Sequence, residues 1–327
     1  MRRAAAPRWR SLLAGCALAL GLSGCAGVYT AGGTAPATPA TAASASGRLD
    51  DTPRIAVISA FEPEIVLLLS RLQGARKYSV GGVEFTTGTL QGKPVVLFLS
   101  GISMTNAAMN TQRVLDRFRI TRIVFSGIAG GVNPQLHVGD VAVPAQWSQY
   151  LEVLMARETA PGRYVAPPFI TDATLPNFGM MFPRSVETRS AAQPGIVRKF
   201  WFVADPGMLE VARGIRGIDL ASCSSAGQCL ARKPQLVVGG NGVSGQAFMD
   251  NKAYREYTFR TFQANVLDME TAAVGMVAYS NGVPYIAFRS LSDLAGGGEG
   301  ENEMGTFMGI AADNSAKVLL AFLAAWK

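Results

Sequence analysis

The sequence predicts an α/β fold with a mixed, largely parallel central sheet sandwiched by helices. From residue 54 to the end of the chain, short β-branched runs alternate with longer segments that have the apolar spacing of amphipathic helices. The chain is 49% hydrophobic, and residues 54–327 are enough for one large core, so we expect a single domain there. This alternation is typical of sheets whose parallel strands are joined by helices.

The first half of this domain supplies the clearest elements. The segment 83–101 predicts a hairpin that turns at Gln91-Gly92-Lys93, because polar residues and a glycine interrupt two apolar runs. Strands are predicted over 54–60 and 122–131, and helices over 62–72 and 105–118.

The second half continues the alternation. A helix over 271–281 is predicted to end at Gly282, with Pro284 shortly after it. Further strands are predicted over 234–245, 264–270 and 283–293, and a final helix near 314–326. Each of the last two strands ends in an acidic residue, which bears on function.

The N-terminus has the layout of a secretory leader. Four arginines precede an apolar segment, 12–22, that is too short to stay in a membrane as a span. It ends in Leu22-Ser23-Gly24-Cys25, which resembles the lipobox of bacterial lipoproteins. We therefore expect residues 1–24 to be a signal peptide and Cys25 to be lipidated. The alternative is an ordinary cleaved signal with an incidental cysteine.

The segment after this cysteine predicts a tether. Residues 25–53 are mostly Ala, Thr, Gly, Pro and Ser, which bury too little apolar surface to offset the entropy of ordering. Ala26 suits outer-membrane sorting, by resemblance to lipoproteins. We expect the protein in the bacterial periplasm, attached by lipid to the outer membrane.

The basic charge is partly a property of the leader. The whole chain has a formal charge of +7, and removing the leader, with its four arginines and no acidic residue, leaves +3. The remainder has no basic cluster interleaved with aromatic residues, so nucleic acid is not an expected partner.

Two cysteines remain in the predicted mature domain. Cys223 and Cys229 lie in a polar, glycine-containing segment, and in an oxidising periplasm we expect them to pair. The alternative is two independent thiols. No His or further Cys lies near them to form a zinc site, so no metal is expected.

Acidic residues recur where predicted strands end. Glu62 and Glu64 follow the first strand, Glu270 follows the strand 264–270, and Asp293 ends the strand 283–293. Ligands in such sheets gather at the carboxyl ends of the strands, so these acids predict a site. For Glu270 there is also a simpler interpretation, since a carboxylate is favourable at the N-terminus of any helix.

Several sequence blocks, in order, resemble one family. They are AVISAFEPEIVLLL, SGISMTNAAMNTQ, SGIAGGVNPQLHVGDV, GVSGQAFMDNKAYREY, VLDMETAAV and FRSLSDLAGG. These blocks resemble the nucleoside phosphorylase and nucleosidase superfamily, specifically methylthioadenosine/S-adenosylhomocysteine nucleosidases and plant bark storage proteins. The resemblance implies a three-layer, nucleoside phosphorylase-like fold over 54–326, a purine nucleoside as ligand, a homodimer and no cofactor.

The resemblance also implies catalytic roles. Glu64 would be the general base for water, and Asp293 would donate a proton towards N7 of the purine. Glu270 would hydrogen-bond the ribose hydroxyls. Arg289 would orient Glu64 or the water, and Ser292 would steer Asp293.

Apolar residues are assigned to the substrate in the same way. Phe248 would stack on the base while the backbone of Met249 contacts its edge, and Met269 would pack against the sugar. Phe61 stands where relatives have a flexible Met in the pocket for the 5′ substituent. Ile102 begins an apolar run, 102–109, that is assigned to the substrate pocket and to the dimer surface.

Two departures from the family limit what these assignments imply. Ile128 stands where cytosolic nucleosidases have a small hydroxyl residue near the water, so that contact is lost. The stretch 145–233 is longer than in those relatives, and substrate-facing residues cannot be traced through it.

Three functions remain open from the sequence. Hydrolysis of the N-glycosidic bond is preferred; phosphorolysis and non-catalytic nucleoside binding or storage are the alternatives. Phosphorylases of the superfamily have a glycine-aspartate turn after the first strand and an arginine that holds phosphate, whereas this chain has SAFEPEI and no arginine until Arg71. A phosphate dianion would therefore lack a nearby cation.

The lipid anchor can be tested directly. Cys25→Ser removes the thiol that would be acylated, so the protein should leave the detergent-soluble membrane fraction, because acyl chains provide the membrane affinity. Membrane fractionation of the parent and the variant measures this. Continued retention of the variant in membranes would contradict a lipoprotein.

Overall fold

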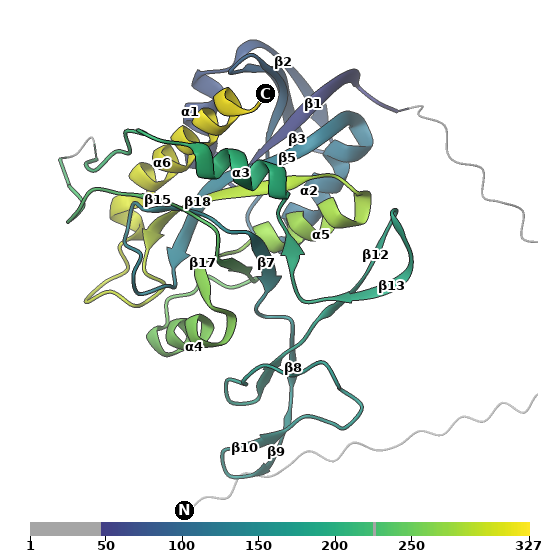
Figure 1. Cartoon of the computed structure of the whole chain (residues 1–327), viewed down its shortest axis with the longest axis vertical. Helices are drawn as coiled ribbons and strands as arrows, with labels where there is room; N and C mark the ends of the chain where they lie inside the picture. The colour runs from purple at the N-terminus through teal and green to yellow at the C-terminus, as the bar shows by residue number, and fades with distance from the viewer. Residues whose placement is uncertain (1–46, 225–226) are drawn as a thin grey trace, which may run out of the picture. The chain divides into compact units, whose positions relative to one another are not determined.

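The computed structural model describes residues 47–224 and 227–327, so the predicted leader and Cys25 lie outside the described residues. These residues form one domain around a twelve-stranded sheet (Figure 1). Its main path runs β14 (Phe202–Val203), β7 (Gln146–Gln149), β16 (Asn241–Ser244), β17 (Ala264–Asp268), β5 (Phe118–Gly131), β1 (Asp50–Ser59), β4 (Lys93–Leu99), β3 (Val83–Leu90) and β2 (Gln73–Val80). Off this path, β18 (Tyr285–Asp293) pairs with β5 and with β6 (Val141–Val143), and β6 pairs with β15 (Leu236–Val238).

The sheet is mixed, as predicted. Its centre is parallel: β1 pairs in parallel with β4 and β5, and β5 with β18. The predicted hairpin is present as the antiparallel pair β3–β4, joined at Gln91 and Gly92. We expected the strands that carry the acids to end at the same edge of a parallel sheet. β17 differs, because it pairs antiparallel with the end of β5, with Leu267 opposite Gly130. Glu270, which follows β17, therefore approaches the site from the opposite direction to Glu64, which follows β1, and to Asp293, which ends β18.

Helices cover both faces of the sheet, which confirms the three-layer arrangement. Alternate residues of β5 point to opposite faces: Ile123 and Phe125 pack on one side and Val124 on the other. The first side is covered by α2 (Met104–Arg117) and α5 (Thr271–Asn281); the second is covered by α1 (Glu62–Ser70), α3 (Pro206–Gly214) and α6 (Met304–Ala325). α4 (Lys252–Phe262) packs beside β17.

The last helix is longer than the sequence indicated. α6 begins at Met304 rather than near 314, because its first turns pack onto Ile128 although Gly305 and Gly309 weaken helix propensity there. α6 is long and apolar enough to cross a membrane, yet 56% of its most apolar window is buried inside the domain. Its apolar character is accounted for by packing against α1, β5 and β18.

Two predicted boundaries were wrong. The segment 234–245 is two strands, because Gly239 (φ 114°) and Gly240 (φ 71°) turn the chain between β15 and β16. β1 begins at Asp50, so residues 50–53 belong to the sheet and not to the tether predicted over 25–53. Asp50 pairs with Phe118 of β5, and Leu49 N donates to Arg117 O at 2.8 Å, which ties this first part of the strand to the sheet.

Much of the stretch 145–233 lies outside the central sheet. It forms three two-stranded sheets: β8 (Val153–Met155) with β11 (Met181–Pro183), β9 (Arg157–Ala160) with β10 (Arg163–Val165), and β12 (Val186–Ser190) with β13 (Gln193–Lys199). Figure 1 shows β8, β9 and β10 below the layered body, whereas β12 packs against α5, where Ser190 Oγ donates to Tyr279 O at 3.0 Å. The predicted disulfide is confirmed, since Cys223 and Cys229 are bonded.

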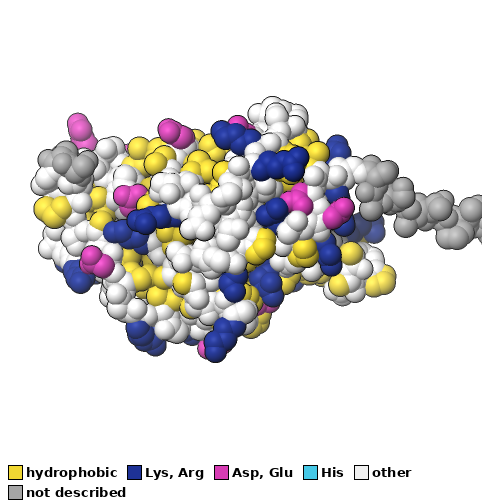
Figure 2. Space-filling model, turned by 90° about the horizontal axis from the view of Figure 1, so that it is seen from above, with side chains coloured by type: hydrophobic (Ala, Val, Ile, Leu, Met, Phe, Trp, Pro, Cys, Tyr) yellow, Lys and Arg dark blue, Asp and Glu magenta, His cyan; other side chains and the backbone are white. Residues whose placement is uncertain are grey.

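Charged side chains are dispersed over the surface. On the face seen in Figure 2, Lys and Arg lie among apolar and acidic side chains and form no continuous patch. Several are paired, for example Lys77 with Glu84 at 2.8 Å and Arg198 with Glu187 at 2.9 Å. Such exposed pairs contribute little to stability. This face offers no basic track of the kind that a nucleic-acid backbone requires.

Candidate active site

The predicted acids meet at one cavity. A pocket of about 320 Å³ lies where β1, β5, β17 and β18 end, and it is of a size that holds a small ligand. Its lining is mostly apolar. The polar side chains in it are Glu64, Asp268, Glu270, Ser292 and Asp293.

Glu64 is held by backbone N–H groups. It lies in the first turn of α1, where Pro63 suits the helix start, and its carboxylate accepts from Ala60 N at 2.6 Å and from Ile128 N at 2.7 Å. The side chain is 1% exposed. Burial raises the pKa of Glu64, against the opposing effects of Arg289 and the two N–H donors. Glu64 therefore combines a fixed position with raised basicity.

Glu270 does more than begin a helix, which was the simpler interpretation of this residue. It occupies the N-cap position of α5 but makes no capping bond, and its Oε1 accepts instead from Ser103 N at 2.9 Å. Ser103 has φ 89°, a backbone conformation that costs about 1–3 kcal/mol for a residue other than glycine. Burial raises the pKa of Glu270 to about 7, against Arg289, while Asp268 adds to the rise.

Asp293 ends β18 and is bound on both oxygens. Oδ1 accepts from Ala295 N at 2.7 Å, and Oδ2 accepts from Ser292 Oγ at 2.9 Å. The predicted contact between Ser292 and Asp293 is thus present. Burial raises the pKa of Asp293, which favours the protonated form that a general acid needs.

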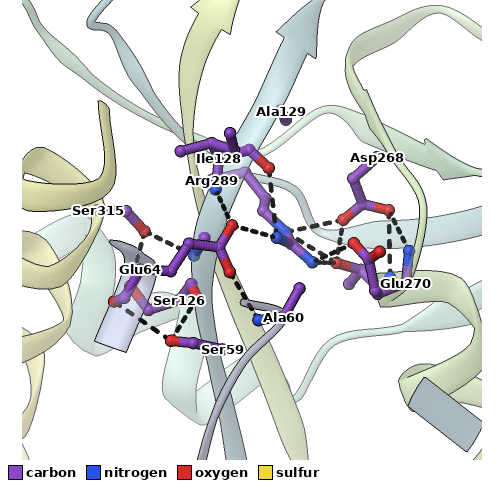
Figure 3. A network of polar contacts seen from close by, with 12 residues as sticks. Ser59, Ala60, Glu64, Ser126, Ile128, Ala129, Asp268, Glu270, Arg289 and Ser315 are labelled. Atoms are coloured by element: carbon purple, nitrogen blue, oxygen red, sulfur yellow. Dashed lines mark hydrogen bonds and ion pairs between the residues drawn. The ribbon is translucent and has the colours of Figure 1, made fainter. Parts of the chain in front are cut away.

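Arg289 lies behind the acids. Its side chain is fully buried and does not line the cavity; Nη1 is 3.7 Å from Glu64 and Nη2 is 3.6 Å from Glu270 (Figure 3). The guanidinium also stacks over Phe125, 4.0 Å from the ring centre. The predicted contact with Glu64 is present. The alternative, in which Arg289 touches the water directly, is not supported, because carboxylates separate it from the cavity.

The sequence alone did not identify Asp268 as part of this cluster. It is 2.7 Å from Arg289 Nε, nearer than either predicted acid, and it also borders the cavity. Its spacing of two residues from Glu270 suggested a shared strand face, but the strand ends at Asp268 and the chain turns there. The Ser103 N–H was also missed, since a backbone donor leaves no mark in a sequence.

The apolar residues predicted to bind substrate are brought together. Together with Ile128, with Met304 of α6 and with smaller apolar residues, they line the cavity: Phe61, Ile102, Phe248, Met249 and Met269. Phe248 is 57% exposed and Ile102 is 49% exposed, so both lie at the open side. None of the described residues of 145–233 lines the cavity. The residues that line the pocket therefore all come from the rest of the domain.

The lining suits proton transfer to an uncharged ligand. Among the described residues no Lys, Arg or His side chain faces the cavity, so an anionic ligand has no side-chain partner there. In the same residues no group of three or more His, Cys, Asp or Glu side chains could hold a metal ion. The lone histidine, His137, lies in a loop beside Arg232, outside the pocket.

Comparison with known proteins places this geometry in context. Residues 54–324 match the Phosphorylase superfamily. The 5′-methylthioadenosine/S-adenosylhomocysteine nucleosidase of Halalkalibacterium halodurans is 30% identical over 271 residues, covering 83% of this chain and 97% of that protein.

Solved structures of similar proteins share the fold. The nucleosidase from S. pneumoniae with the transition-state inhibitor MT-ImmA aligns with a TM-score of 0.59 and 25% identity, over 83% of this chain and 99% of its own. The nucleosidase from Colwellia psychrerythraea 34H in complex with adenine aligns with a TM-score of 0.61 and 25% identity, over 84% of this chain and 95% of its own.

The pKa of Glu270 predicts a pH-dependent stability. Because the folded state raises this pKa from 4.5 to about 7, Glu270 stabilises the fold most below pH 4.5, and this contribution is lost as pH rises through 7. Glu270→Gln does not titrate. Its stability relative to the parent should therefore improve by about 2–3 kcal/mol between pH 4.5 and 8, measured by urea unfolding. A difference that stays constant over this range would contradict the raised pKa.

Proposed function

This chain belongs to the phosphorylase superfamily, and from that premise we propose that it hydrolyses the N-glycosidic bond of purine nucleosides. Substrates such as 5′-methylthioadenosine or S-adenosylhomocysteine are supported by the names of its relatives. The observation that carries the proposal is the convergence of Glu64, Glu270 and Asp293, all buried, on one largely apolar cavity. Such a pocket accommodates a base and a sugar and supplies the groups that the reaction needs.

Each of the three carboxyl groups has one role in the hydrolysis. Glu64 takes a proton from water as the water oxygen bonds to the anomeric carbon. The bond from that carbon to the purine breaks, its electron pair goes to the base, and Asp293 gives its proton to N7. Glu270 accepts hydrogen bonds from the ribose hydroxyls and stabilises positive charge on the ribosyl group. A raised pKa suits both Glu64 as a base and Asp293 as an acid.

Water is a better-supported nucleophile than phosphate. The guanidinium of Arg289 is fully buried behind Glu64 and Glu270 and does not line the cavity. A phosphate dianion in the cavity would face carboxylates with no side-chain cation among the described lining residues. Ile128 has no side-chain hydroxyl to bond a water in the cavity, and its N–H donates to Glu64 at 2.7 Å.

Membrane attachment is proposed on the N-terminal sequence. Cys25 would carry the lipid in the periplasm, and residues 25–49 would act as a spacer before β1 begins at Asp50. The disulfide between Cys223 and Cys229 supports an oxidising compartment.

A homodimer is proposed on the exposed side of α2. Ile102, just before α2, and Met109 are 49% and 48% exposed, and a groove between α2 and α5 is lined by Met109, by apolar residues such as Met276 and by polar residues such as Gln112. A second copy would bury this surface and border the open side of the cavity. Sedimentation velocity at micromolar concentration should give a dimer; a single monomeric species would contradict the proposal.

The roles of two acids can be separated by isosteric changes. Glu64→Gln keeps size and hydrogen bonding but removes the base, so purine release should fall by about 10²-fold or more with little change in affinity for a non-hydrolysable nucleoside analogue. Glu270→Gln should weaken both, because the charged acceptor for the ribose hydroxyls is lost. Purine release is followed by absorbance and affinity by calorimetry.

Controls make this comparison specific. Glu62→Gln changes an exposed carboxylate in the same first turn of α1 and should turn over at the parent rate. Added phosphate should leave the parent rate unchanged, whereas a rate that requires phosphate would establish phosphorolysis. A parent that binds the analogue but releases no purine from any nucleoside would establish a binding or storage protein.

A further inference from the structure

One guanidinium serves three carboxylates unequally. Arg289 is completely buried, and its Nε lies 2.7 Å from Asp268 Oδ2. Its distances to Glu270 and Glu64 are longer, at 3.6 Å and 3.7 Å, and nearly equal. Of the three carboxylates, only that of Asp268 lies within hydrogen-bond distance of Arg289. Arg289 is held by Asp268, by Thr271 Oγ1 and by Ile128 O, and it approaches the two catalytic-site acids without closing onto either (Figure 3).

Asp268 is surrounded by donors alone. Oδ1 accepts from Ser244 Oγ at 2.5 Å and from the N–H groups of Glu270 and Thr271, each at 3.1 Å. Oδ2 forms an ion pair with Arg289 Nε at 2.7 Å and accepts from Thr271 Oγ1, and this hydroxyl in turn accepts from Arg289 Nε at 3.0 Å and from Nη2 at 2.8 Å. An ionised carboxylate, which is an acceptor only, satisfies this pattern. The carboxylate and the hydroxyl together fix the guanidinium.

We propose that Asp268 is a positioning residue for the hydrolysis: its ion pair with Nε holds Arg289 midway between Glu64 and Glu270 and keeps it from forming a tight pair with either. This inference rests on the proposed function. Its physical basis is that a buried guanidinium attracts every carboxylate near it, and the attraction is strongest at the shortest distance. Asp268 takes that place, which leaves Glu64 free to accept a proton.

Charge near Glu64 and Glu270 supports this arrangement. Arg289 opposes the raised pKa of both residues, whereas Asp268 adds to the raised pKa of Glu270. Without the charge of Asp268, Arg289 would act on the two glutamates undiminished, and both would become weaker bases.

The other groups around Asp268 do not titrate in the range of interest. Tyr150 and Tyr285 face it, and burial raises the pKa of each, so both stay neutral in the physiological range. Phe125 packs against the guanidinium from the remaining side. The charged groups that face Arg289 are thus Asp268, Glu64 and Glu270.

The experiment uses Asp268→Asn in the whole protein. With the charge gone, Arg289 should close onto Glu64 and Glu270, so the acid limb of the kcat–pH profile should move down by about one pH unit and kcat should fall about 10-fold. The alkaline limb, which reports the acid Asp293, should stay in place. Carbon-13 titration of the glutamate carboxyl groups, assigned with Glu64→Gln and Glu270→Gln, should show the same downward shift without relying on activity.

A matched control separates position from stability. Asp140 is also buried and accepts from the N–H groups of His137 and Gln235, but it does not line the cavity. Asp140→Asn should lower stability and move neither limb. Should Asp268→Asn fail to fold, Thr271→Val, which keeps the Asp268 charge and removes the bridging hydroxyl, should move the acid limb the same way by less.

The possible results distinguish the positioning role of Asp268 from the proposed hydrolysis. The positioning role would be overturned if a folded Asp268→Asn variant left both limbs of the kcat–pH profile and the pKa values of the glutamate carboxyl groups unchanged. If Asp268→Asn does not fold, the same result in Thr271→Val would overturn it. A downward shift of the glutamate titrations supports it. Absence of purine release from the parent would overturn the proposed function instead, and the carboxyl titrations would still decide whether Asp268 controls Arg289.

Discussion

The buried positive charge of Arg289 is the constraint around which this site is organised. A guanidinium with no exposed surface has lost its hydration, so it must be matched by carboxylates and hydrogen bonds within the protein. Asp268 forms the closest ion pair with it, at 2.7 Å, and Glu64 and Glu270 lie further away, at 3.7 Å and 3.6 Å. Because three carboxylates share one cation, burial outweighs attraction at the two glutamates and raises the pKa of each.

The fold makes this crowding of acids possible. Residues far apart in the chain meet because β1, β5 and β18 are parallel neighbours and β17 reaches the end of β5 from the other direction. Each acid is then held by a backbone N–H that the local turn exposes: Ala60 for Glu64, Ser103 for Glu270 and Ala295 for Asp293. These donors fix the carboxylates without adding a titratable group. The resulting site is rigid, acidic and apolar around its rim.

The extra segment 145–233 changes the outside of the molecule and not this centre. Its described residues contribute strands at the edge of the sheet, three small sheets and a disulfide, but no part of the cavity wall. The end of the cavity is closed instead by α6 through Met304. Phe61, Ile102, Phe248 and their apolar neighbours form the side walls of the cavity.

The alternation of strands and helices could be predicted from the sequence, because hydrophobic periodicity and the residues that end helices and strands are properties of short segments. The same local patterns placed Glu64 and Glu270 after predicted strands and Asp293 at the end of one. The sequence could not place the start of α6 or the break at Gly239 and Gly240, since packing overrode or redirected local preference. Only the tertiary structure decided that Asp268, and not Glu64, holds Arg289 most closely. That choice depends on ångström differences among β17, β18 and α1, which no spacing within the chain encodes.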